Sequence, residues 1–179
     1  MITNTKEQQS SQSIVADMMG KKYYEFESDI VVDSTSIRSI CAASYNVNPL
    51  FWDESVAEAI VGACIAPPSS VSAWLRPHFW SPTVNDNARA LKLHFDLKER
   101  FGVPEGVMVD NELTMFTPVR TGERLRTYQT LRSVSEEKQV KLGLCRFWVI
   151  DVVIENLAGE RCAIDRYTGL GYRKIQNDE

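Results

Sequence analysis

The fold is decided by four β-rich segments that read MVDNELTMF (108–116), RLRTYQTLRSV (124–134), QVKLGLCRFWVIDVVIEN (139–156) and RCAIDRYTGLGYR (161–173). Each segment is rich in Val, Ile, Thr, Tyr, Phe or Trp, the residues that favour extended strands. Turn-forming residues stand between them at 120–123 (RTGE) and 156–159 (NLAG). Short connections between long strands predict an antiparallel meander.

The residues before this region favour helices. A short strand is predicted at 22–27 (KYYEFE), and a helix is predicted to begin after the N-cap Asp33. That helix should end within 45–49 (YNVNP), because Asn favours turns and the residue before a proline avoids the helical conformation. A second helix is predicted to begin after Asp53 and to stop at Gly62.

A third, apolar helix is predicted at Pro68–Leu75, and it is the best candidate for the central position against the sheet. A further helix is suggested within 88–101. Helices followed by an antiparallel sheet predict an α+β fold. We expect residues 1–13 to be a disordered polar tail and residues 14–179 to be a single domain, without internal repeats.

Composition excludes several classes of protein. The 179 residues carry 24 acidic and 20 basic side chains, a formal net charge of -4, and the basic residues form no run that would follow a phosphate backbone. No apolar run reaches the roughly 18 to 20 residues of a membrane span. We therefore expect neither a nucleic-acid nor a membrane partner. The polar N-terminus does not resemble a secretory signal, so a cytoplasmic location is expected.

The cysteines and histidines do not indicate a metal centre. The cysteines are widely spaced, lack a C-x-x-C pair and have apolar neighbours, which favours reduced core thiols: Cys41, Cys64, Cys145 and Cys162. His78 and His94 are the only histidines, so one chain cannot build a three-His zinc site. No metal or cofactor is predicted.

Two pairs of stretches resemble the MaoC-like dehydratases, the hot-dog family that includes (R)-specific enoyl-CoA hydratases. The first pair is AASYNVNPLFWDESVAEA (42–59) with GACIAPPSSVSAWL (62–75), and the second is FTPVRTGERLRTYQTLRSV (116–134) with IENLAGERCAIDRYT (154–168). The resemblance is strongest to the N-terminal or non-catalytic partner halves of the family. It implies a hot-dog fold, in which an antiparallel sheet wraps around a central helix.

The catalytic positions of the family are degenerate in this chain. Active members read roughly S-G-D-x-N-P-L-H-x-D, and their Asp and His act as general acid and base on water and an enoyl thioester. On residues 44–53 that Asp becomes Asn46 and that His becomes Phe51. The His-Gly that begins the central helix becomes Pro67 and Pro68, and proline has no N–H to bind the thioester oxygen. We predict no catalytic residue in this chain.

Other side chains could in principle replace the missing pair. Asp53 matches the last Asp of the signature, but its position favours a helix cap. Glu54 and Glu58 favour a solvated helix face. His78 and His94 are interpreted as surface histidines rather than pocket groups, and the tryptophans are interpreted as core rather than ligand platforms: Trp52, Trp74 and Trp80.

The resemblance therefore implies a subunit of an acyl-CoA hydratase or dehydratase that adds water to a trans-2-enoyl-CoA. A smaller MaoC-like partner would supply the Asp/His pair, in a heterodimer or heterotetramer, while this chain shapes the acyl pocket. The alternatives are a hot-dog thioesterase that uses Asp53 or Glu58, and a non-enzymatic binding or stabilising subunit. The positions that the resemblance assigns to substrate binding are Asn48, Phe51, Trp52, Pro67, Ser69 and Trp74.

Overall fold

The computed structural model describes residues 12–76 and 91–174. After a helical segment at residues 12–18, the elements in chain order are β1 (Tyr23–Glu27), α2 (Ser34–Ala43), η1 (Pro49–Phe51), α3 (Glu54–Val61), η2 (Pro68–Leu75), α4 (Lys92–Arg100), β2 (Glu105–Met115), β3 (Leu125–Val134), β4 (Lys138–Val140), β5 (Gly143–Asn156) and β6 (Arg161–Arg173). Residues 1–11 of the expected tail lie outside the described part, and residues 12 and 13 are already helical.

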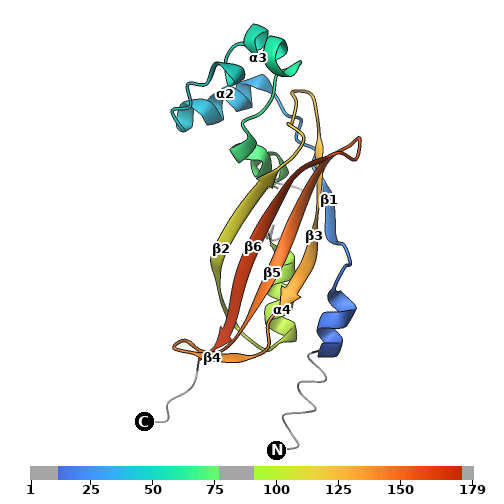
Figure 1. The fold of residues 1–179 in the computed structure, drawn as a ribbon, viewed down its shortest axis with the longest axis vertical. Coiled ribbons are helices and arrows are strands. Elements are labelled where there is room, and N and C mark those ends of the chain that lie inside the picture. The colour runs from blue at the N-terminus through green and yellow to red at the C-terminus, as the bar shows by residue number, and fades with distance from the viewer. Residues whose placement is uncertain (1–11, 77–90, 175–179) are drawn as a thin grey trace, which may run out of the picture.

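The strands form one six-stranded antiparallel sheet in the order β1-β3-β5-β6-β2, with β4 paired to β5 (Figure 1). This arrangement confirms the α+β prediction. The prediction that all four β-rich segments form a simple meander was wrong, because β2 pairs with β6 and not with β3. The segment between β2 and β3 is held at the end of the sheet instead, where Ala66 N donates to Val119 O and Thr121 N donates to Cys64 O.

The segment predicted as one strand at 139–156 is two strands. A turn separates β4 from β5, and β4 folds back to pair Lys138 with Cys145. Gly143 follows the turn with φ 125, and a Cβ there would lie 2.1 Å from Arg173 O. The position therefore requires glycine, which is the physical reason that a continuous strand does not form.

The predicted helix ends are confirmed. Asp33 caps α2 by accepting from Ser36 N at 2.9 Å. Asp53 caps α3, and Gly62 ends that helix in the left-handed conformation at φ 75. These local side-chain bonds satisfy backbone N–H groups that a helix end leaves free, so the sequence fixes where each helix begins.

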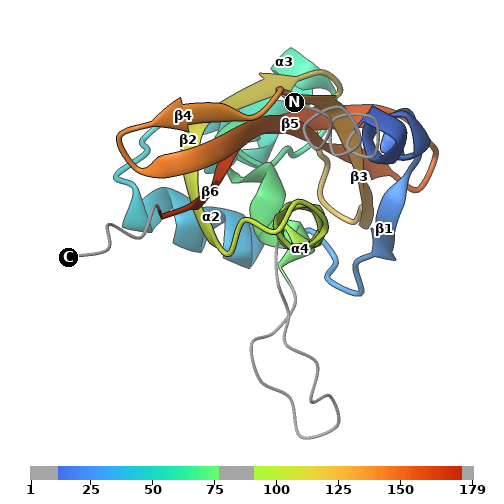
Figure 2. The same ribbon diagram turned by 90° about the horizontal axis from the view of Figure 1, so that it is seen from below.

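Two short helices share the central position against the sheet. Pro68–Leu75 is a 3₁₀ helix rather than an α-helix, and α4 lies further along the same face of the sheet (Figure 2). We call the face covered by η2 and α4 the inner face and the opposite one the outer face. The prediction of one central helix at 68–75 is therefore incomplete, because that helix reaches only part of the sheet.

The core divides into two clusters along the inner face. The upper core joins η2 and α2 to the sheet and contains Ile37, Val71, Trp74, Leu125, Ile154 and Ala163 among its buried members. The lower core joins α4 to the sheet and contains Leu93, Leu97, Val103, Leu131, Trp148 and Ile150. Burial of these apolar side chains is the main force that fixes both helices on the sheet.

His94 belongs to the lower core and not to the surface, so its prediction as a surface histidine was wrong. Its side chain is buried, and its Nδ1 accepts from Trp148 Nε1 at 3.1 Å. A Cβ on Gly169 would lie 2.5 Å from Trp148 Nε1, and a Cβ on Gly171 would lie 2.2 Å from the Trp148 ring. Glycines on β6 thus make the space that the indole and the imidazole occupy.

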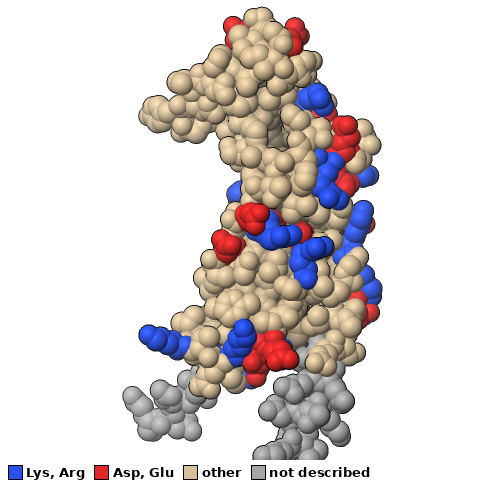
Figure 3. Space-filling model, in the orientation of Figure 1, with Lys and Arg blue, Asp and Glu red and all other residues tan. Residues whose placement is uncertain are grey.

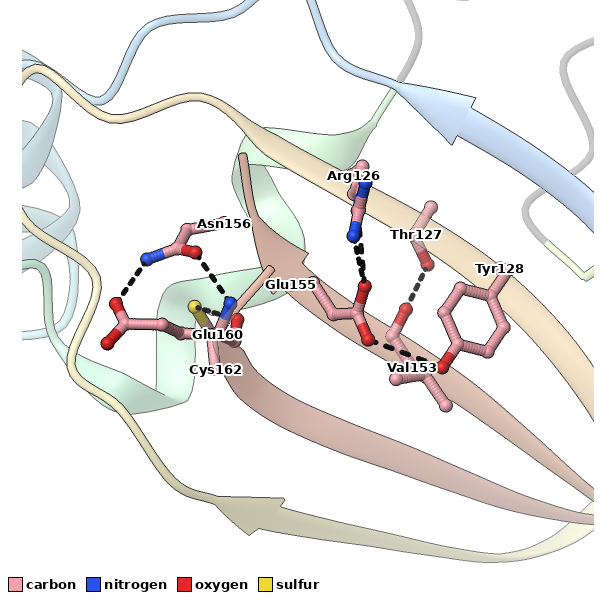
Figure 4. A network of polar contacts seen from close by, with 8 residues as sticks. All are labelled: Arg126, Thr127, Tyr128, Val153, Glu155, Asn156, Glu160 and Cys162. Atoms are coloured by element: carbon pink, nitrogen blue, oxygen red, sulfur yellow. Dashed lines mark hydrogen bonds and ion pairs between the residues drawn. The ribbon is translucent and has the colours of Figure 1, made fainter. Parts of the chain in front are cut away.

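Ion pairs cover the outer face, where Figure 3 shows charged side chains of both signs over the strands and few at the end formed by α2 and α3. Arg166 Nε lies 2.7 Å from Asp151 Oδ1, and Arg126 Nη2 lies 2.9 Å from Glu155 Oε2. Tyr128 Oη donates to the other Glu155 oxygen at 3.3 Å (Figure 4). The two faces of the sheet therefore differ: apolar clusters pack on the inner one and ion pairs form on the outer one.

Candidate functional site

The loop at 44–53 is held rigid by its own side chains. Asn46 Oδ1 accepts from Asn48 N at 3.0 Å, and Asn48 Oδ1 accepts from Leu50 N at 3.1 Å. Trp52 Nε1 donates to Asn46 O at 2.7 Å. The polar groups of Asn46, Asn48 and Trp52 thus fix the backbone, and an amide such as that of Asn46 cannot act as a general base near neutral pH.

The acidic side chains of this region have structural roles or lie in solvent. Asp53 Oδ1 accepts from Ser55 N at 2.9 Å and from Ser55 Oγ at 2.6 Å. Hydrogen bonds from Ser55 and Val56 lower the pKa of Asp53, which is the opposite of what a general acid requires. Glu54 and Glu58 are exposed, as expected.

A small apolar cavity of about 60 Å³ lies where η2 begins and β2 ends. Pro67, Pro68 and Val71 line it from one side, and Met115 and Phe116 line it from the other. Neither proline has an N–H, so this end of η2 cannot donate the hydrogen bond that a thioester oxygen needs at that position. The cavity can take an apolar group but offers no oxyanion donor from these two residues.

Cys162 is the titratable group that lines this cavity. Burial raises the pKa of its thiol to about 11, so the thiolate that a nucleophile requires is scarce near neutral pH. All four cysteines are free thiols, and all but Cys64 are buried. The expectation of reduced core cysteines is confirmed for three of them.

The structure brings together only some of the predicted substrate-binding residues. Phe51 packs against the upper core, which contains Trp74 and two residues of the cavity wall, Ala66 and Val71. Pro67 lines the cavity itself. The remaining three are exposed and line no part of this cavity: Asn48, Trp52 and Ser69.

Trp74 has one unusual feature. Its side chain is only 3% exposed, and its Nε1 has no hydrogen-bond partner in the described part of the chain.

His78 and Trp80, which were also considered as candidates from the sequence, lie outside the described residues. Within 12–76 and 91–174, no cluster of His, Cys, Asp or Glu is arranged to hold a metal ion, and no helix is long and apolar enough to cross a membrane.

The resemblance implied that one edge of the sheet is left to be paired, but sequence reasoning did not identify β2 as that edge. In the described part, β2 pairs with β6 on one side and with no strand on the other. It is 11 residues long, and most of its apolar side chains are exposed, among them Val107 at 44%, Val109 at 47% and Met115 at 50%. A long, apolar, unpaired edge is a ready surface for another strand.

A polar cluster on the inner face was missed as well. Tyr167 Oη donates to Asp165 Oδ2 at 2.6 Å, and Asn111 Nδ2 donates to Asp165 Oδ1 at 2.6 Å. The period of two along β6 could have found it, since it places Asp165 and Tyr167 on the same face as the apolar Ala163.

Comparison with known proteins identifies the family of this chain. A family model described as FAS1-like, dehydratase domain region, matches residues 17–165. No curated protein matches the chain. Among solved structures the chain is similar to a chain of the ChsH1-ChsH2 complex from Mycobacterium tuberculosis, at 21% identity and a TM-score of 0.73, with 93% of each chain covered.

Two further structures share the fold. One is the C-terminally truncated HadBC (3R-hydroxyacyl-ACP dehydratase) complex from Mycobacterium tuberculosis, at 21% identity and a TM-score of 0.56, covering 86% of this chain and 97% of that one. The other is the MaoC-like dehydratase from Rhodospirillum rubrum, at 15% identity and a TM-score of 0.58, covering 87% and 94%. The family match and this shared fold together show that the chain is a MaoC-like hot-dog protein that belongs to the FAS1-like dehydratase family.

Proposed function

We propose that this chain is the non-catalytic half of an acyl-CoA hydratase, in which a smaller MaoC-like partner supplies the catalytic Asp and His. The observation that supports the proposal is the loss of chemistry at three positions together. Asn46 uses its amide oxygen to hold its own loop, Phe51 packs on the core, and Pro67 with Pro68 offers no N–H. The reaction would be the reversible addition of water to a trans-2-enoyl-CoA.

The partner would pair with the edge strand β2. Pairing along this strand would satisfy its free backbone groups and bury apolar side chains such as Val107 and Val109. It would also place the cavity beside the partner, because Met115 and Phe116 at the end of β2 line that cavity. The complex would be a heterodimer or a heterotetramer, in the cytoplasm.

This chain would then shape the pocket for the acyl group. Phe51 and the cavity wall present mainly apolar surface to such a group, and the short helices η2 and α4 take the place of one central helix. We propose that the space suits a bulky acyl chain, such as a branched, aromatic or steroid-derived one.

The deciding experiment is co-purification from the native host, followed by hydration assays of the isolated chain and of the complex. The chain alone should be inactive, and the complex should hydrate bulky trans-2-enoyl-CoA thioesters faster than crotonyl-CoA. Robust hydration by the chain alone would overturn the proposal that this chain is the non-catalytic half. Equal rates on crotonyl-CoA and on every bulky thioester would overturn the proposed pocket.

The thioesterase alternative makes a separate prediction. It requires a carboxylate that is free to attack or to activate water, whereas Asp53 is engaged as a helix cap. Hydrolysis of acyl-CoA by the isolated chain, abolished by Asp53→Asn, would favour it. A binding subunit would instead leave the partner's rate unchanged when Phe51 is replaced by Ala.

A further inference from the structure

The centre of the inner face carries a polar cluster between two apolar cores. Alternate residues of β6 point to this face: Ala163 belongs to the upper core, and Gly169 abuts the Trp148 and His94 side chains of the lower core. Asp165 and Tyr167 lie between these two positions on the same strand. The neighbouring edge strand contributes Asn111, which stands opposite Tyr167 in the β2–β6 register.

Two short hydrogen bonds hold the carboxylate of Asp165. Tyr167 Oη donates to one oxygen and Asn111 Nδ2 to the other, each at 2.6 Å. Asp165 is only 7% exposed, and among the described residues no Lys or Arg forms an ion pair with it. Burial and the bond to Asp165 raise the pKa of Tyr167, so the phenol keeps its proton and remains a donor to the carboxylate.

Within the described part of the chain, only acceptor atoms of the cluster are still free to form hydrogen bonds. The Tyr167 proton is used on Asp165, and Asn111 Nδ2 also donates to Arg166 O at 3.1 Å, so neither group has a donor left. The phenol oxygen, the Asn111 amide oxygen and the carboxylate still have lone pairs. A ligand that fits must donate a hydrogen bond.

The surroundings of the cluster combine one positive charge with apolar side chains. The positive charge of Arg76 acts on Tyr167. Asn111 is exposed, and the apolar side chains of Met108 and Met115 are exposed on the same strand. Apolar surface around these acceptors suits a hydrocarbon that carries one hydroxyl group.

We propose that Asp165, Tyr167 and Asn111 form an anchor for a hydroxyl group on the acyl chain of the substrate. The inference rests on the proposed function and deepens it, because it assigns the acyl group to the class of hydroxylated, mainly apolar chains. Asn111 of the anchor stands on the edge strand β2, where an acyl chain held by the partner would enter.

The test uses the complex and matched pairs of trans-2-enoyl-CoA thioesters, from decenoyl to hexadecenoyl, each with and without an ω-hydroxyl group. The variant is Tyr167→Phe, which removes one oxygen atom and keeps the ring. The matched control is Tyr128→Phe, since Tyr128 also donates to a carboxylate, that of Glu155, but on the outer face of the sheet (Figure 4). KM and Kd are measured for both members of each pair.

For a chain long enough to reach the cluster, wild-type complex should prefer the hydroxylated thioester. Tyr167→Phe should lower the ratio of the two affinities about three- to tenfold, the effect of one neutral hydrogen bond, and Tyr128→Phe should leave the ratio unchanged. An unchanged ratio in Tyr167→Phe at every chain length would overturn the anchor.

The two proposals fail separately. A complex that binds the thioesters but hydrates none of them refutes the hydratase function, while the Kd ratio still decides the anchor. A complex that hydrates both members of each pair equally, before and after Tyr167→Phe, refutes the anchor alone.

Discussion

Gly169→Ala tests how the inner face of the sheet packs on α4. The new Cβ would lie 2.5 Å from Trp148 Nε1 and 2.9 Å from His94 Nδ1, and a side-chain atom cannot approach that closely. One of the two rings must move, which breaks their 3.1 Å hydrogen bond. Overpacking costs about 1–3 kcal/mol and an unsatisfied buried polar group about 1–3 kcal/mol more, so we expect a loss of about 2–6 kcal/mol.

The assay is urea unfolding followed by tryptophan fluorescence, with thermal unfolding beside it. A loss of that size lowers the Tm of a chain of this length by about 4–24 °C. Thr168→Ala, one residue earlier and on the opposite face, is the control and should change stability by less than about 1 kcal/mol. A Gly169→Ala variant within about 0.5 kcal/mol of wild type would refute the packing described for Trp148 and His94.

Three further predictions concern pH, a helix cap and assembly. Burial lowers the pKa of His94 to about 4, so the folded chain resists a proton that the unfolded chain binds. The contribution of His94 to the free energy of unfolding should be complete above pH 6.5 and should fall as the pH drops from 6.5 towards 4. Urea titrations of His94→Asn, whose amide can still accept from Trp148, should show less of this fall. Asp53→Ala removes the cap of α3 and should lower the Tm by a few degrees while the complex keeps its hydration rate; loss of hydration with an unchanged Tm would give Asp53 a chemical role. Val107→Lys on the β2 edge should weaken partner binding at least tenfold in sedimentation or titration experiments, whereas Val31→Lys, equally apolar and exposed but outside the sheet, should not.

Much of the fold could be predicted because it is decided by local chemistry. Asp33, Asp53 and Gly62 bound their helices through side-chain or backbone bonds within a few residues, and the β-rich segments carry their own propensity. Strand order is different, because it depends on which edges remain free after folding. Nothing in the local sequence of β2 distinguishes pairing with β3 from pairing with β6, so the meander was a reasonable but wrong prediction.

The candidate site was predicted unevenly for a similar reason. The absence of a catalytic pair at Asn46 and Phe51 follows from side-chain chemistry, which needs no coordinates. The burial of His94 does not, because it depends on Gly106 and Gly169 lying against the helix from two different strands. Hydrogen bonds between positions far apart in the sequence, such as the one from Asn111 to Asp165, cannot be predicted from the sequence alone either.

The loop at 44–53 keeps an unusual backbone conformation. Tyr45 stands where the family signature has Gly, and it adopts φ 52, a conformation that costs a non-glycine residue about 1 kcal/mol or more. Hydrogen bonds of Asn46 and Asn48 hold the loop in that shape despite the cost. We propose that the loop contributes this shape, and no acid or base, to the complex proposed above.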